Sequence, residues 1–266
     1  MNAPNDTQSE TILLRSDQAG VATLTLNRPA QFNSLSQELL IELQAALTAI
    51  AADSTVRVVV IAGAGKGFCS GHDLKQMRAN PSKAYMQNLF KRTGKVMMTL
   101  TEMPQPVIAR IHGVATAAGC QLMAMCDLVV AADGVRFAVS GINLGLFCST
   151  PAVALSRAMG RKQAMEMLLT GEFIDAPEAQ RRGLVNRVVP LDELDAEIKK
   201  LTDSICGKSA VAVSMGKQLF YRQLEMGLEG AYQLACETMA CNMMAADAAE
   251  GIDAFMQKRK PEWKGC

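Results

Sequence analysis

Long hydrophobic runs and an excess of one charge are both missing from this 266-residue sequence. No run approaches the ~20 consecutive apolar residues of a membrane-spanning helix, and the first ten residues lack the basic and apolar regions of a signal peptide. Lys and Arg total 27 against 26 Asp and Glu, so no net field is available to hold a polyanion. We therefore expect a cytoplasmic protein with no membrane span and no nucleic-acid partner.

Metal-ligand patterns are missing as well. The eight cysteines include no CxxC pair, and the only histidines, His72 and His112, are too few to complete a zinc cluster. Four cysteines lie in apolar or glycine-rich surroundings that are typical of buried, reduced thiols: Cys69, Cys120, Cys126 and Cys148. The sequence predicts free thiols and no bound metal.

The hydrophobic pattern predicts an α/β fold with a mostly parallel sheet. β-branched or apolar runs alternate with helical stretches, which is the order that parallel sheets require. The predicted strands are Val21–Leu26, Val56–Ile61, Pro106–Ile111, Leu128–Ala132, a short strand near Phe137, and Leu184–Val189. Between them, Ser34 or Ser36 caps a helix with an apolar stripe from Leu39 to Ile50.

Helix signals mark the chain from about Thr150 onward. Thr150 and Pro151 predict a helix start, with Gly160 as its stop. From about Asp192 onward the residues predict successive amphipathic helices and no strand. We expect a core over 1–190 and a helical oligomerisation region over 191–266.

A glycine loop follows the second predicted strand, at residues 63–68 (Gly-Ala-Gly-Lys-Gly-Phe). A dinucleotide fingerprint needs a third glycine where Phe68 stands, and a phosphate loop needs glycine at Val60 and Ser or Thr at Gly67. The loop fits neither template. We interpret it as a turn, which is the usual role of isolated glycine motifs.

Two other segments place small residues where a predicted strand turns into the next element, at residues 68–74 and 112–122. Small side chains let a ligand approach the backbone, and N–H groups that open a helix are unpaired and aligned with the positive end of its dipole. Two such groups that converge would bind a developing oxyanion, each contributing ~3 kcal/mol of transition-state stabilisation. Tight glycine packing explains either segment alone equally well.

Taken together, these segments resemble the crotonase (enoyl-CoA hydratase/isomerase) superfamily over nearly the whole chain. The resemblance also includes residues 33–35 (Asn-Ser-Leu), 126–128 (Cys-Asp-Leu) and 254–260. Within the superfamily, the enoyl-CoA hydratase domain-containing protein 3 group is similar at residues 70–74, 117–121, 145–151 and 257–261.

The resemblance implies stacked ββα units and a C-terminal helical trimerisation region, in a homotrimer or a hexameric dimer of trimers. It implies an acyl-CoA ligand whose thioester oxygen lies between the backbone N–H groups of His72 and Ala118. Coenzyme A is then part of the ligand, and no cofactor is permanently bound. Family positions that contact CoA match Ser70, His72, Leu74 and Lys75 and, from a neighbouring subunit, Phe255 and Lys258.

The departures from the family pattern concern proton transfer. Enoyl-CoA hydratases use two glutamates that flank a water, one as base and one as acid. The matching positions hold Gln121 and Gly141. Glutamine binds a water but exchanges no proton near neutral pH, and glycine has no side chain. The resemblance therefore does not support the standard hydratase mechanism, and Gln121→Glu with Gly141→Glu is expected to raise hydration.

Other nucleophiles and polar residues have competing interpretations. An acyl-CoA dehalogenase branch carries its nucleophilic aspartate at the position of Ser149, which places Ser149 and Cys148 beside the expected acyl pocket. A helix cap and a small buried group explain these two residues as well, and no base is identifiable unless the side chain of His72 faces the pocket. We expect His112 to be structural and Asp127 to anchor backbone donors.

Three hypotheses for function remain. In the first hypothesis, the chain is an acyl-CoA enzyme of fatty acid metabolism. It would then belong to the lyase or isomerase class, with weak or altered hydratase activity, or be a thioester hydrolase. Alternatively, it binds acyl-CoA without catalysis. In the third hypothesis it is an assembly protein that has kept only the fold.

Overall fold

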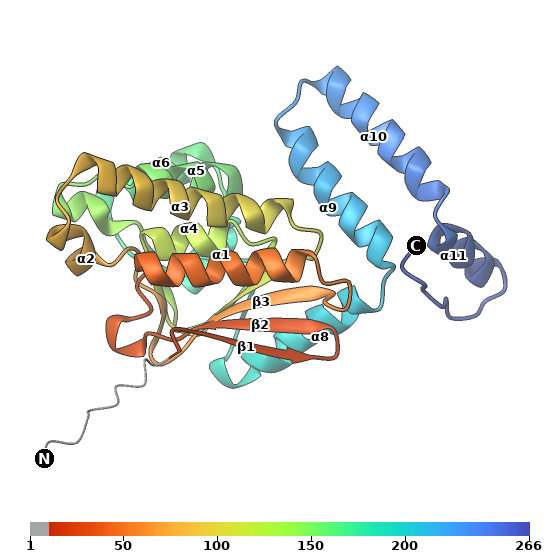
Figure 1. Cartoon of the computed structure of the whole chain (residues 1–266), viewed down its shortest axis with the longest axis horizontal. Coiled ribbons are helices and arrows are strands. Elements are labelled where there is room, and N and C mark those ends of the chain that lie inside the picture. Colours follow the sequence, from red (N-terminus) through yellow and green to blue (C-terminus); the bar gives the residue numbers. More distant parts are fainter. Residues whose placement is uncertain (1–10) are drawn as a thin grey trace, which may run out of the picture.

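The computed structural model describes residues 11–266, which form an α/β fold with two sheets (Figure 1). The larger sheet has the order β1 (Leu13–Gln18), β2 (Val21–Leu26), β3 (Val58–Gly63), β5 (Val107–Ile111), β7 (Leu128–Ala132) and β10 (Arg187–Val189). The smaller sheet has the order β4 (Gly67–Cys69), β6 (Val114–Thr116), β8 (Arg136–Ala138) and β9 (Ile174–Asp175). Neighbouring strands are parallel except in the pairs β1–β2 and β8–β9.

The core repeats one unit, a strand of the large sheet followed by a strand of the small sheet and then a helix. β3 and β4 lead to α2 (Leu74–Ala79) and α3 (Lys83–Glu102), and β5 and β6 lead to α4 (Ala118–Ala124). β7 and β8 lead through the 3₁₀ turn η2 (Ser140–Leu144) to α5 (Ser149–Ala158). The expectation of stacked ββα units is confirmed. Because β4 and β6 are parallel neighbours, the segments that follow them lie side by side.

The sequence patterns explain the elements around this core. Ser36 caps α1 (Gln37–Ala51) by accepting a hydrogen bond from the N–H of Leu39, and the predicted stripe from Leu39 to Ile50 is buried. The β-branched run of β3 is buried on both faces, because α1 and α3 lie on one side of the sheet and α8 (Leu194–Cys206) lies on the other (Figure 1). β10 is shorter than the strand predicted over Leu184–Val189.

The predicted start of the helix, with Thr150 as the cap, lies later in the chain than the observed cap, Cys148. α5 begins at Ser149, with Cys148 at the N-cap position and no side-chain capping bond, because the N–H of Ser149 turns back to the carbonyl of Phe147 at 2.7 Å. Pro151 fits inside the first turn, where N–H groups have no helical partner. Gly160 follows directly after Met159, the C-cap of α5, as the predicted stop requires, and it is also the N-cap of α6 (Arg161–Thr170).

The C-terminal residues are helical, as predicted. Three further short elements lie in the core: η1 (Pro29–Gln31), α7 (Ala176–Arg181) and η3 (Leu191–Glu193). α8 packs on β3, β5 and β7, whereas α9 (Ala210–Leu224), α10 (Leu228–Met243) and α11 (Ala246–Met256) project from the core (Figure 1). We call these three helices the arm. The division of the chain at residue 190 stays a prediction.

A buried ion pair fastens the arm to the core. Lys217 of α9 donates to the carboxylate of Asp127 at 2.7 Å and to the carbonyls of Leu100 and Gln105 at 2.7 and 2.8 Å. Tyr221, one helical turn further on, donates to the other oxygen of Asp127 at 2.8 Å. Asp127 also accepts the N–H of Val107 at 2.6 Å, which confirms its expected anchoring role.

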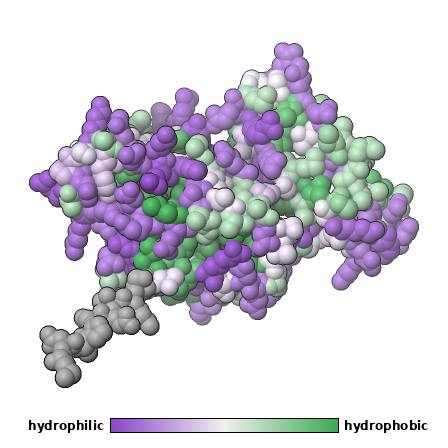
Figure 2. All heavy atoms as spheres, in the orientation of Figure 1, coloured by the Kyte–Doolittle hydropathy of each residue, from purple (hydrophilic) through white to green (hydrophobic). Residues whose placement is uncertain are grey.

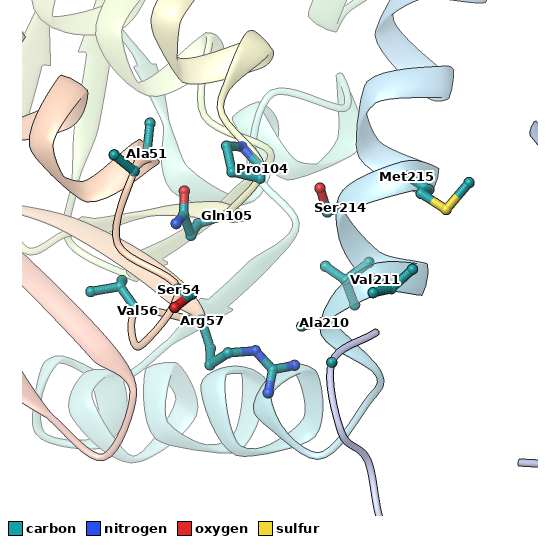
Figure 3. A pocket seen from close by; sticks show the side chains of 13 residues that line it. Ala51, Ser54, Val56, Arg57, Pro104, Gln105, Ala210, Val211, Ser214 and Met215 are labelled. Carbon is teal, nitrogen blue, oxygen red and sulfur yellow. The ribbon is translucent and has the colours of Figure 1, made fainter. Parts of the chain in front are cut away.

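The arm exposes a large apolar surface in the single chain, part of which is visible in Figure 2. The exposed side chains are Phe220, Leu224, Leu228, Tyr232, Met239, Met244, Phe255 and Met256. A cleft of about 380 Å³ separates the first turns of α9 from the loop after α1 and from Pro104 and Gln105 (Figure 3). Exposed apolar surface of this extent marks an interaction face.

Candidate active site

The two glycine-containing segments predicted from the sequence press their backbones together. A Cβ atom at Gly119 would lie 2.1 Å from the carbonyl oxygen of Cys69, a distance that no side chain tolerates. A Cβ atom at Gly71 would lie 2.9 Å from the Cβ of Ala117 and 3.1 Å from the nitrogen of Ala118, and Gly71 has a φ of +96°. Only glycine at both positions allows this approach.

The backbone at the start of α4 is strained. Ala117 has φ 48° and ψ −117°, a conformation that costs a non-glycine residue ~1–3 kcal/mol and is typical of functional sites. Its own N–H donates to the carbonyl of Ala138 at 2.9 Å, and its carbonyl accepts the N–H of Gln121 at 3.1 Å. Ala118 is the first helical residue, so its N–H has no partner within the helix.

The N–H of His72 is left unpaired in a similar way. Leu35 forms a parallel bridge with this segment, donating to the carbonyl of Gly71 at 2.7 Å and accepting the N–H of Asp73 at 3.2 Å. Because successive N–H groups of extended backbone point to opposite sides, the N–H of His72 points away from Leu35. The N–H groups of His72 and Ala118 therefore lie on adjacent segments without a backbone acceptor among the described residues.

The side chain of His72 is held against α3. Thr93 gives its own proton to the carbonyl of Leu89 at 3.0 Å, so its hydroxyl accepts from Nε2–H of His72 at 2.9 Å. The imidazole also contacts the ring of Phe90 edge to face, with the centroids 5.3 Å apart. Burial lowers the pKa of His72 to about 4. The imidazole is neutral at pH 7 and is a weak base.

Gln121 brings an unsatisfied acceptor close to these groups. It lies one turn after Ala118 on α4, and helical side chains lean toward the N-terminus of their helix. The residue is 4% exposed, and its Oε1 atom is buried without a hydrogen-bond partner in the described part of the chain. A buried acceptor left unpaired costs ~1–3 kcal/mol, which a ligand or a water with a donor would recover.

Gly141 has no space for a side chain. A Cβ atom there would lie 2.6 Å from Sγ of Cys148 and 2.8 Å from the carbonyl oxygen of Leu146. The thiol of Cys148 is buried and donates to the carbonyl of Val139 at 3.5 Å, and burial raises its pKa. The η2–α5 loop is thus closed around Gly141.

Ser149 does not cap α5. It is exposed, and its hydroxyl donates to the carbonyl of Phe147 at 3.3 Å. The side chain of His72 is committed to Thr93 on α3 and is not placed to activate it. The helix-cap interpretation of Ser149 is therefore wrong, and the geometry shows no base placed to activate its hydroxyl as a nucleophile.

The predicted CoA-binding residues fall into two groups at opposite ends of the molecule. Ser70, Leu74 and Lys75 belong to the β4–α2 segment, where the carbonyl of Ser70 accepts the hydroxyl of Thr116 at 3.0 Å. Phe255, 85% exposed, and Lys258 lie at the end of α11, on the opposite side of the molecule from α2 (Figure 1). Within one chain, therefore, the two groups do not meet.

Some residues that shape the site were not singled out as site residues from the sequence. Asn33 is fully buried and donates to the carbonyls of Ala64 and Gly67, both at 2.8 Å, which fixes the glycine loop. Arg28 pairs with Asp73 at 2.9 Å and holds the start of α2. Asn33 entered only through the family resemblance, because neighbours such as Gln31, Ser34 and Ser36 are polar as well and the local pattern does not set it apart.

The expectations for the four cysteines and for His112 are confirmed. The four cysteines expected to be buried are buried and free. His112 is structural, since its Nε2 lies 2.9 Å from the carbonyl of Gly65. Within residues 11–266 no helix is long and apolar enough to cross a bilayer, and no group of three or more His, Cys, Asp or Glu side chains is placed to hold a metal ion.

Comparison with known proteins identifies the family. The model of the enoyl-CoA hydratase/isomerase family matches residues 16–266, so the chain belongs to this family. Within it, the chain belongs to the enoyl-CoA hydratase domain-containing protein 3 group. The mitochondrial protein of that name from Xenopus laevis is 43% identical, over 99% of this chain and 90% of its own length, and the Mus musculus protein is 45% identical, over 92% and 82%.

Solved structures agree with this assignment. A crystal structure of the human domain-containing protein 3 has a TM-score of 0.92 and 44% identity, covering 95% of this chain and all of that one. A crystal structure of an enoyl-CoA hydratase from Mycobacterium smegmatis has a TM-score of 0.94 and 58% identity, covering 96% and 99%.

The relatives correct one expectation. We expected a cytoplasmic protein from the absence of a signal peptide and of apolar runs. The vertebrate relatives at 43–45% identity are named mitochondrial, so that expectation is wrong. Amino-acid composition and hydrophobic pattern do not report on a mitochondrial destination.

The close approach of the two segments predicts a strong asymmetry between two glycine variants. Gly119→Ala places a methyl group against the carbonyl of Cys69, so its free energy of unfolding should fall by ~3 kcal/mol or more. Gly94→Ala is the matched control, because Gly94 lies inside α3 with nothing within 4 Å of its Cβ position. It should stabilise the protein by up to ~1 kcal/mol.

Urea unfolding followed by circular dichroism measures both variants. Equal stability of Gly119→Ala and Gly94→Ala would show that the two segments are not in contact.

Proposed function

We propose that the chain binds acyl-CoA and polarises its thioester carbonyl between the backbone N–H groups of His72 and Ala118. This proposal rests on the two N–H groups, which have no backbone acceptor among the described residues and lie on segments that are in close contact at Gly71 and Gly119. The Ala118 donor also lies at the positive end of α4. Such donors are fixed before the ligand arrives, so no reorganisation is needed when negative charge develops on the oxygen.

Coenzyme A enters this proposal as part of the ligand and not as a resident cofactor. The β4–α2 segment supplies Ser70, His72, Leu74 and Lys75, and an assembled trimer or dimer of trimers supplies Phe255 and Lys258 of the partner subunit. The separation of these two groups along one chain supports completion of the site between subunits (Figure 1). The exposed apolar surface of the arm supports the same assembly.

Polarisation without rapid hydration is the chemistry we assign to this site. Hydration needs a group that gives a proton and a group that takes one. Gln121 offers an amide, Gly141 has no room for a side chain, and His72 is neutral and bonded to Thr93. Other acyl-CoA chemistry, thioester hydrolysis included, and binding without turnover both fit these groups. An assembly role is the alternative if no acyl-CoA binds.

A thioether analogue tests the carbonyl contact directly. S-butyl-CoA lacks the carbonyl oxygen of butyryl-CoA but keeps the nucleotide and the chain. It should bind about ten- to thirtyfold more weakly, because two backbone hydrogen bonds of ~1 kcal/mol each are lost. Calorimetry measures both dissociation constants. Equal affinities would contradict the carbonyl contact, and absence of binding by either ligand to folded protein would contradict acyl-CoA binding itself.

Crotonyl-CoA hydration should be several powers of ten slower than in a hydratase with both glutamates, because each acid or base contributes about 10²–10⁴-fold. Gln121→Glu alone should not restore the rate. Contrary to the expectation from the sequence, adding Gly141→Glu should not restore it either, since the new side chain meets Cys148 and the carbonyl of Leu146. Loss of absorbance of the enoyl thioester measures the rate, with an intact hydratase assayed in parallel. Rapid hydration by the wild-type protein would refute this assignment.

A further inference from the structure

A strongly basic surface lies beside the candidate site. Between Asp73 and Glu102 the chain has six of its 27 Lys and Arg residues and none of its 26 Asp and Glu residues. The net charge of +1 for the whole chain therefore hides a local excess of positive charge. We call this surface the α2–α3 basic face; its members are Lys75, Arg78, Lys83, Lys91, Arg92 and Lys95.

These cations are all exposed, and none of them forms an ion pair within residues 11–266. On α3 they occupy the side opposite to the buried stripe, which contains Leu89, Thr93 and Val96. Lys91 and Lys95 are one turn apart on that outer side. Figure 2 shows hydrophilic residues over α2 and α3.

The basic face is tied to the candidate site by direct contacts. Phe90 and Thr93 of α3 both touch the imidazole of His72, whose N–H is one of the two proposed donors. Lys91 and Arg92 stand between these two contact residues in the sequence, so they lie on the outer side of the same helical turn. The helix places these charges at least about its own diameter, ~10–12 Å, from the site, so they act on it strongly only at low salt, where the Debye length reaches ~30 Å at 0.01 M.

Two of the four acidic residues on the neighbouring elements have side-chain partners. Asp73 pairs with Arg28 at 2.9 Å, and Glu38 of α1 accepts the amide of Gln76 at 3.0 Å. Glu42 on α1 and Glu102 at the end of α3 are the other acids of the elements that pack here. The six cations of the basic face outnumber these four acidic residues, so the outer side of α2 and α3 keeps a net positive charge.

We propose that the α2–α3 basic face attracts the phosphate groups of the CoA moiety, so that Arg78, Lys83, Lys91, Arg92 and Lys95 act together with Lys75. This inference rests on the proposed function, because it assumes that acyl-CoA is the ligand. A field of one sign beside a site raises the local concentration of an oppositely charged ligand, and salt screens it. The attraction therefore depends on ionic strength and acts only on ligands with phosphates.

The test replaces three cations of the face and keeps Lys75. Lys91→Gln, Arg92→Gln and Lys95→Gln are combined in one variant. The control variant combines Lys199→Gln, Lys200→Gln and Lys208→Gln, which removes the same charge on and after α8, across the sheet from α3 (Figure 1). Dissociation constants for butyryl-CoA and for butyryl-pantetheine, which has no phosphate, are measured by calorimetry on the full-length protein.

At about 20 mM salt the basic-face variant should bind butyryl-CoA about tenfold more weakly than wild type. At about 0.5 M salt the dissociation constants of the two proteins should agree within about twofold. Its affinity for butyryl-pantetheine should be unchanged, which excludes structural damage at the site. The control variant should match wild type with both ligands.

The two proposals fail in different ways. Wild-type protein that binds neither ligand overturns the proposed function, and the basic-face proposal with it. Wild-type binding of butyryl-CoA that the basic-face variant retains at low salt overturns the basic-face proposal alone. An equal loss of affinity for both ligands also overturns it, because the effect is then not electrostatic.

Discussion

The contact between the backbones of Cys69–His72 and Ala117–Gly119 is the constraint on which the rest of the structure depends. It requires glycine at 71 and 119, because a Cβ atom at either would meet the opposite segment. It also requires β4 and β6 to be parallel neighbours, which the repeated ββα unit provides. The strain at Ala117 is the local cost of turning the chain from β6 into α4 within this space. Asn33 and the Arg28–Asp73 pair then hold the neighbouring loops in place.

The side chains around this contact do not titrate near neutral pH. Burial raises the pKa of the Cys69 thiol to about 12 and lowers that of His72 to about 4. Gln121 has an amide where proton transfer needs an acid, and the loop at Gly141 is closed by Cys148. A site of this kind holds hydrogen-bond donors in place but exchanges no protons. That is why we assign polarisation of a thioester to it and not rapid hydration.

Much of the fold was predictable, because burial imposes its period on the sequence. The stripe of α1, the β-branched run of β3 and the helices after Asp192 all follow from hydrophobic pattern and match the structure. The repeat of the ββα unit was not visible in the sequence, since β6 and β8 have only three residues each and carry no period. The start of α5 was misplaced because a tight turn at Phe147 overrides the capping signal of Thr150. In the site, the glycines indicated close backbone approach, but contacts such as His72 with Thr93 join residues far apart in the sequence.

The most direct test of the proposed site is a crystal structure of the assembled protein with butyryl-CoA bound. The proposed site predicts a thioester oxygen about 2.7–3.1 Å from the backbone nitrogens of both His72 and Ala118, the distance expected of oxyanion donors. It also predicts that Phe255 and Lys258 of the partner subunit lie at the CoA moiety. A thioester oxygen bonded elsewhere, with these two N–H groups turned to solvent or to other protein groups, would contradict it.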